Sequence, residues 1–153
     1  MNTYFDFKYW KEQAKMSDVP PDEYYTQILP RFPAADFNAG VVITLNGTIH
    51  HRYYLRTDYL IHELVHVKQQ IESGLTAQEW LDRYFEDEEF RLQIELEAFG
   101  TQHKWIEKNY PRNSHHNFYL ESAKNLCSEL YQFKNMDILK AISLIKQSGH
   151  YVK

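Results

Sequence analysis

The sequence contains a single cysteine, Cys127, among its 153 residues. One cysteine cannot form an internal disulfide, so we expect a fold that is stable without one and a cytoplasmic location. The chain has no apolar run of about 18 residues, the length of a membrane helix, and its first residues include no basic stretch followed by an apolar one. We therefore expect neither export nor a membrane partner.

The chain also has no excess of positive charge. Its 17 Lys and Arg residues face 21 Asp and Glu residues, a formal net charge of −4, and no basic block interrupts the sequence. Proteins that bind nucleic acid rely on clustered positive charge. Nucleic acid is therefore an unexpected partner.

Linkers, repeats and low-complexity segments are absent as well. The composition, 43% hydrophobic and 25% charged, is sufficient for a buried core. We therefore expect one domain that covers residues 1–153, with an oligomeric state that the sequence does not indicate.

The N-terminal part predicts one helix, a loop and a hairpin. The helix is expected over Tyr4–Met16, before two prolines, and a loop with short helical pieces should follow up to Gly40. Asn46-Gly47 separates two β-branched runs, 41–45 and 48–54, which is the strongest short signal of a β-hairpin.

The remainder predicts helices. Thr57 is expected to cap a helix over 58–73, and Thr76 and Glu79 predict a capping box. The expected helices cover 58–73, 76–85, 87–109, 113 or 114–133, and 135–147. The predicted fold class is α+β, mainly helical, with a small β-hairpin or sheet that precedes the helix at 58–73.

That helix carries His62-Glu63-Leu64-Val65-His66, an HExxH pattern. Histidines at positions i and i+4 lie on one helix face, about 6 Å apart along the axis, so both can reach one tetrahedral metal ion. Glu63 lies beside the ion, where it can accept a proton from a metal-activated water. The pattern predicts His62 and His66 as metal ligands and Glu63 as a catalytic base.

Helical phase supports this interpretation, because two sets of residues separate around the helix. The apolar set is Leu60, Ile61, Leu64, Val65, Val67 and Ile71. The polar set is Tyr59, His62, Glu63, His66 and Gln70. Asp58, in the first turn, could orient His62, but we expect it mainly to interact with the helix dipole.

A third ligand is expected from the helix over 87–109. Glu95 lies in the middle of its apolar face, whereas Glu97 lies in a polar strip. A buried carboxylate needs a cation, which a metal would supply. Glu95 is therefore the expected ligand and Glu97 the alternative, while a buried ion pair with Arg91 is the non-metal explanation for Glu95.

The order His62-Glu63-Leu64-Val65-His66, then Glu95-Leu96-Glu97-Ala98, resembles the gluzincin branch of the zincin metallopeptidases. Over about 41–105 it also resembles small uncharacterised bacterial and phage-type proteins of this class. The resemblance implies a bound Zn²⁺ and selects Glu95, which opens a Glu-x-x-Ala pattern. It further implies that an edge strand before the zinc helix pairs with an extended polypeptide substrate.

One position departs from the family. Many gluzincins have Asp or Asn four residues after the ligand glutamate, where it orients a ligand histidine, but Phe99 follows Glu95 at that distance. If Glu97 were the ligand, Thr101 would take this place.

We therefore expect a zinc-dependent metallopeptidase in which a zinc-activated water attacks the peptide bond and Glu63 is the general base. The alternative is a binding or regulatory protein that keeps the zincin-like fold, with or without zinc, and is not a general protease. A second donor should stabilise the transition state. No spacing selects it from the candidates Tyr53, Tyr54, His103, Tyr110, His115, His116 and Tyr119.

Overall fold

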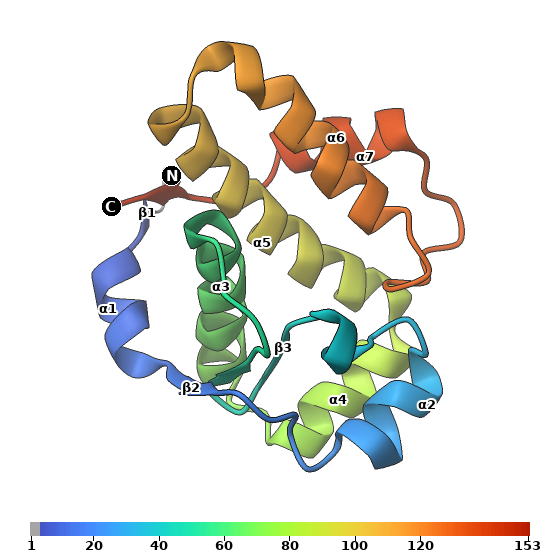
Figure 1. Ribbon diagram of the computed structural model, residues 1–153. Coiled ribbons are helices and arrows are strands. Elements are labelled where there is room, and N and C mark those ends of the chain that lie inside the picture. Colours follow the sequence, from blue (N-terminus) through green and yellow to red (C-terminus); the bar gives the residue numbers. More distant parts are fainter. Residues whose placement is uncertain (1–3) are drawn as a thin grey trace.

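The computed structural model describes residues 4–153. Two long helices lie at its centre, α3 (Thr57–Ser73) and α5 (Glu88–Asn109), and they pack against each other (Figure 1). Helices α6 (His115–Leu126) and α7 (Ile138–Lys146) cover one side of α5, and α4 (Ala77–Glu86) packs near its start. The predicted class is confirmed: the fold is α+β and mainly helical, with small sheets.

The first segment differs from the single helix predicted over Tyr4–Met16. A short helix, α1 (Phe7–Gln13), is capped by Asp6 and lies between two strands, β1 (Tyr4–Phe5) and β2 (Lys15–Ser17). Strand β1 pairs with the C-terminal strand β5 (Tyr151–Val152), and β2 pairs with a strand of the hairpin. The prediction was wrong at both ends because partners distant in the sequence draw these residues into extended structure.

The hairpin that precedes α3 is confirmed, although its strands are shorter than predicted. Strand β3 (Ile43–Leu45) pairs antiparallel with β4 (Thr48–His50), and the turn residues Asn46 and Gly47 have φ of 52° and 77°. The strand order is β2-β4-β3, so β3 lies at an edge of the sheet.

The loop before the hairpin contains the short helical pieces that were expected. A π-helical turn (Tyr24–Ile28) continues into α2 (Leu29–Arg31), and a 3₁₀ turn (Phe37–Ala39) precedes Gly40. Tyr24 fixes this segment, because its hydroxyl donates to the carbonyl of Ala35 at 2.8 Å and accepts from the N–H of Phe37 at 2.9 Å.

The helix ends confirm some predicted caps and correct others. Thr76 and Glu79 form the predicted capping box of α4. Thr57 is not a cap: it is the first residue of α3, and the preceding Arg56 contributes no side-chain capping bond. Asp87 is the N-cap of α5 rather than its first residue, and a 3₁₀ turn (Arg112–Ser114) leads into α6.

The last two helices are shorter than predicted. Helix α6 ends at Leu126 rather than at Phe133, and α7 runs over Ile138–Lys146 with Asp137 as its N-cap. The chain between them returns to the core, where the buried guanidinium of Arg91 donates to the carbonyl of Tyr131 at 2.9 Å. The residues that were predicted to extend the helix to Phe133 instead form turns and loop.

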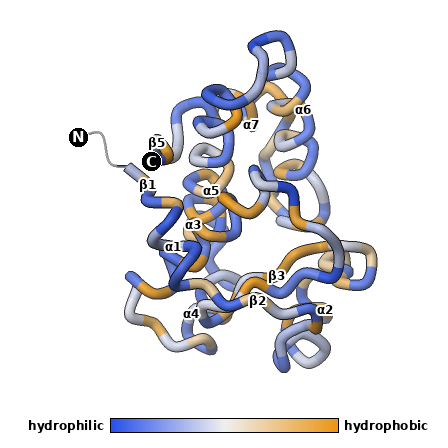
Figure 2. Tube along the Cα trace, turned by 60° about the vertical axis from the view of Figure 1, so that its left-hand side comes forward, coloured by the Kyte–Doolittle hydropathy of each residue, from blue (hydrophilic) through white to orange (hydrophobic). Residues whose placement is uncertain are grey.

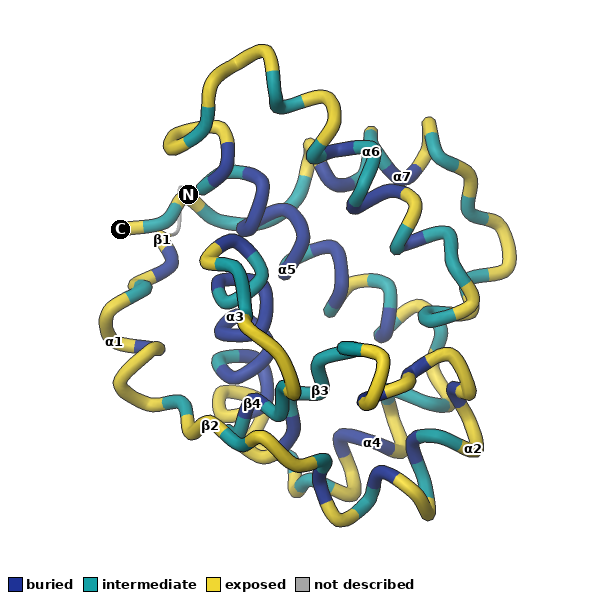
Figure 3. Tube along the Cα trace, viewed as in Figure 1, coloured by how far each residue is buried: buried dark blue, intermediate teal, exposed yellow. Residues whose placement is uncertain are grey.

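Burial is concentrated in α3 and in the middle of α5 (Figure 3). Apolar stretches lie in the interior elements, while the outer loops are mostly hydrophilic (Figure 2). On α3 most of the predicted apolar side is buried, but Leu60 is only partly buried and Ile71 is 51% exposed. The histidine side is buried too, because it faces α5. Within residues 4–153, none of the helices combines the length and apolar character that crossing a membrane requires.

Candidate metal centre

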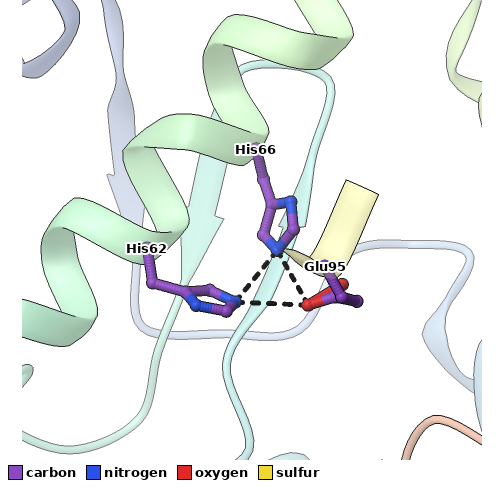
Figure 4. Close-up of side chains that lie close together, drawn as sticks. All are labelled: His62, His66 and Glu95. Atoms are coloured by element: carbon purple, nitrogen blue, oxygen red, sulfur yellow. Dashed lines mark hydrogen bonds and ion pairs between the residues drawn. The ribbon is translucent and has the colours of Figure 1, made fainter. Parts of the chain in front are cut away.

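Three predicted side chains converge between α3 and α5 (Figure 4). The Nε2 atoms of His62 and His66 are 3.1 Å apart, and Oε1 of Glu95 lies 3.2 Å from the first and 3.3 Å from the second. The alternative ligand, Glu97, is not part of this group, because its carboxylate lies 3.6 Å from Nε2 of His150. The structure therefore brings together the residues selected by helical phase.

Two glutamines determine which nitrogen of each histidine carries the proton. Gln102 donates from Nε2 to Asp58 at 2.7 Å, so its Oε1 accepts from Nδ1 of His62 at 3.1 Å. Gln69 likewise donates to the carbonyl of Ile94 at 3.0 Å and accepts from Nδ1 of His66 at 2.8 Å. With Nδ1 protonated, each neutral imidazole directs the lone pair of Nε2 toward Glu95.

The resulting triangle fits a metal ion. Two nitrogen lone pairs and a carboxylate oxygen repel one another unless a cation lies between them. Zinc binds such donors at about 2.0–2.1 Å, which places neighbouring ligand atoms of a tetrahedron about 3.3 Å apart. The three observed distances of 3.1–3.3 Å match that spacing. Two imidazoles and one carboxylate are also a donor set suited to zinc.

The site is strongly coupled electrostatically. Burial opposes ionisation of Glu95, but His66 and His62 outweigh it and hold the pKa of this carboxyl well below its usual range. Burial also opposes protonation of His66, yet the Glu95 carboxylate raises the pKa of this imidazole to about 9. In the absence of a metal ion, the three side chains therefore hold a proton, which supplies the positive charge at the site.

Glu95 is held by a tyrosine that the sequence analysis did not select. The hydroxyl of Tyr84 donates to Oε2 of Glu95 at 3.0 Å, which leaves Oε1 for the histidines. The ion pair with Arg91 is not formed. Instead Arg91 donates to the carbonyls of Tyr84 at 2.7 Å and Tyr131 at 2.9 Å. Tyr84 comes from α4, and no spacing rule links it to the HExxH pattern.

The predicted base, Glu63, is 8% exposed and is oriented by the edge strand. Thr44 of β3 donates from Oγ1 to Oε2 of Glu63 at 2.7 Å. A hydrogen bond of this kind restricts the carboxylate to one orientation beside the histidines. The hairpin therefore contributes a side chain to the site as well as an edge.

Phe99, which departs from the family pattern, packs its ring against His62 with ring centroids 4.4 Å apart. The polar contact to this histidine comes from Gln102, seven residues after Glu95 on the same face of α5. Asp58 is fully buried and accepts from both Gln102 and Arg56. Asp58 lies in the first turn of α3, as the dipole interpretation requires, and it is also linked to His62 through Gln102.

Two cavities border the centre. One, of about 120 Å³, is lined by all three candidate ligand side chains and by Glu63. The other, of about 460 Å³, borders His62 and Glu63. Tyr131 lines both cavities, although the sequence analysis did not select it.

The predicted transition-state donors are distributed unevenly around these cavities. Tyr53 and Tyr54 border the larger one. His103 and Tyr119 stack on each other, with centroids 4.3 Å apart, and are hydrogen-bonded to Ser122 and Glu107 respectively. Neither cavity is lined by His103, Tyr110, His115, His116 or Tyr119.

Comparisons of the chain with protein-family models, with curated proteins and with solved structures found no match.

Proposed function

We propose that the protein is a zinc-dependent metallopeptidase of the gluzincin type, with His62, His66 and Glu95 as the metal ligands and Glu63 as the general base. The observation that carries this proposal is one cavity bordered by all four of these side chains. A substrate group in that cavity would meet the metal and the base together. A purely structural zinc site is instead enclosed by four protein ligands.

Bound zinc would supply Lewis-acid activation of water and of a substrate carbonyl. Glu63 would accept the proton of the attacking water and then deliver it to the leaving amine. Thr44 would keep the Glu63 carboxylate in the orientation that both transfers need. Gln102 and Gln69 would keep the histidines in the tautomer that binds metal.

The substrate is proposed to be a polypeptide that extends along β3. Because Leu45 and Thr48 close a two-residue hairpin, the main-chain groups of Thr44 face away from β4. The carbonyl of Thr44 accepts from Nε2 of Gln70 at 2.7 Å, which leaves its N–H for a peptide. We also propose a reducing compartment, the cytoplasm, in which Cys127 remains a free thiol.

The test combines metal analysis with one substitution. Purified protein should contain about one zinc per chain, and Glu63→Gln should retain that zinc while zinc-dependent cleavage of a peptide library falls by about 100-fold or more. Glu72→Gln, an exposed position on the same helix, is the matched control and should change neither property. Bound zinc without cleavage by the wild-type protein would instead support the alternative, a zincin-like binding or regulatory protein.

A further inference from the structure

The smaller cavity is lined by the proposed metal centre and otherwise mainly by apolar side chains. The charged or titratable groups that line it, apart from the hydroxyls of Tyr84 and Tyr131, are those of the proposed centre, His62, His66, Glu95 and Glu63. The walls are contributed by the segment before β3, by β3 itself, by α4 and α5, and by the chain that follows α6. Six of the wall residues are Ile28, Phe32, Trp80, Leu81, Phe85 and Ile94.

Neither lysine nor arginine lines this cavity among residues 4–153. The two carboxylates that line it already have partners, since Glu63 accepts from Thr44, and Glu95 accepts from Tyr84 and faces the histidines. A charged group packed against the apolar walls, away from the proposed centre, would lose its hydration without gaining an opposite charge, which is strongly unfavourable. The walls therefore favour an uncharged, apolar occupant.

The volume limits the size of that occupant. An apolar cavity of about 150 Å³ accommodates benzene. The cavity here has about 120 Å³, which suits a branched or linear group of about four heavy atoms, such as the side chain of leucine or methionine. An indole ring would exceed it.

One polar residue that borders the cavity lacks a hydrogen-bond donor. Gln70 borders the cavity, is 8% exposed and uses its Nε2 on the carbonyl of Thr44. Its Oε1 is buried and has no hydrogen-bond partner among residues 4–153. A buried amide oxygen without a donor is unfavourable. A main-chain N–H of a peptide beside β3 is a donor of the kind that this oxygen lacks.

From these observations we infer that the smaller cavity is the specificity pocket of the site, and that it accepts one uncharged aliphatic side chain of about leucine or methionine size from the polypeptide substrate. This inference rests on the proposed function for the identity of the substrate as a polypeptide. The recognition itself depends only on the walls and on Gln70, so it can be measured without catalysis.

The first experiment measures binding in metal-free and zinc-loaded protein by NMR titration with blocked amino acids. N-acetyl-leucinamide should bind at least about tenfold more tightly than the corresponding aspartate, lysine and tryptophan compounds, as expected for burial of one aliphatic side chain. Equal binding of the charged or indole compounds would overturn the inference.

Two substitutions of Leu81 test the location. Leu81→Phe should fill the cavity and weaken binding of the leucine compound about tenfold or more, whereas Leu81→Ala should enlarge it and admit the tryptophan compound. Ala35→Val narrows the same cavity from the segment before β3 and replaces Leu81→Phe if that variant does not fold. The control is Leu139→Phe, at a position 81% exposed on α7, which should leave binding unchanged.

A peptide-library digest with zinc-loaded protein then links the pocket to cleavage. One position next to the cleaved bond should be enriched in leucine, methionine and similar residues, and Leu81→Ala should shift that preference toward larger side chains. If no zinc-dependent cleavage occurs but leucine-selective binding persists and responds to Leu81, the proposed function fails and the pocket stands. Cleavage without this preference, or binding that ignores both Leu81 variants, would refute the pocket.

Discussion

Gln102 on α5 places its Oε1 3.1 Å from Nδ1 of His62 on α3. The same amide donates from Nε2 to the fully buried Asp58. If its oxygen and nitrogen exchanged places, Nε2 would face the Nδ1–H of His62 and Oε1 would face the Asp58 carboxylate, and both hydrogen bonds would be lost. This pairing links the two central helices through the candidate site. Gln102 also supplies the polar contact to His62 that an Asp or Asn at the position of Phe99 would otherwise make.

Replacing Gln102 should therefore weaken metal binding without removing a ligand. Gln102→Leu should lower zinc affinity by about 10- to 100-fold, the usual effect of losing a group that orients a metal-bound histidine. Competition with a chromophoric chelator measures this affinity. Gln93→Leu, at an exposed position on the same helix, is the control, and a variant that binds zinc as tightly as the wild type would exclude the orienting role.

The choice between two nearby glutamates can be tested directly. Glu95→Ala should reduce zinc affinity by more than about 100-fold, because a direct ligand contributes more than an orienting partner. Glu97→Ala should change it by no more than about threefold, since its carboxylate lies beside His150 instead. The reverse order in a chelator competition assay would refute the assignment of Glu95.

Local patterns in the sequence predicted much of this arrangement. The Asn46-Gly47 turn and the capping box of Thr76 and Glu79 depend on neighbouring residues, and both were confirmed. The convergence of His62, His66 and Glu95 followed from helical phase, because a buried carboxylate on one helix needs a partner on another. That these residues bind zinc stays a prediction.

Several of the errors share a physical cause, which is contact between residues distant in the sequence. The segment at Tyr4–Phe5 is a strand because it pairs with β5 near the C-terminus. Arg91 donates to the carbonyls of both Tyr84 and Tyr131, which border the site, and no local spacing rule predicts that arrangement. The role of Gln102 could have been predicted from the sequence, because this residue lies two helical turns after Glu95 on the same face of α5.

Thr44 provides a test of how the base is held. Thr44→Val keeps the β-branched shape of the strand residue and removes the hydroxyl that donates to Glu63. We expect zinc content to be unchanged and kcat for peptide cleavage to fall by about tenfold, the equivalent of one hydrogen bond to a charged group. Thr48→Val on β4 is the matched control, and equal effects of the two substitutions would mean that Thr44 acts only on the sheet.

Tyr131 is the aromatic residue that lines both cavities, and burial together with Glu95 raises the pKa of its hydroxyl well above the ordinary value. It therefore remains a proton donor over the working pH range. Tyr131→Phe should lower kcat by about 100-fold with little change in KM if this hydroxyl stabilises the transition state. Tyr54→Phe, at a position 89% exposed, is the comparison, and a larger effect there would shift the role to the predicted candidate.

His103, which is not one of the candidate metal ligands, provides a stability prediction. Its ring is 1% exposed, its Nδ1 has no partner among residues 4–153, and burial, together with His62 and His115, lowers its pKa to about 4. Nearby Asp58 acts in the opposite direction but is outweighed. The folded protein therefore keeps this histidine neutral at pH values where the unfolded chain already binds a proton.

The sign of the pH effect follows from that difference. As the pH falls from about 6.5 to 4, the unfolded state gains a proton at His103 before the folded state does, so the free energy of unfolding decreases by roughly 3 kcal/mol. His103→Gln removes this term. Urea unfolding at pH 7.5 and at pH 4 should therefore show that the variant loses less stability than the wild type by about that amount. His116→Gln, which removes an exposed histidine, gives the background, and a difference no larger than that background would mean that His103 is protonated inside the fold.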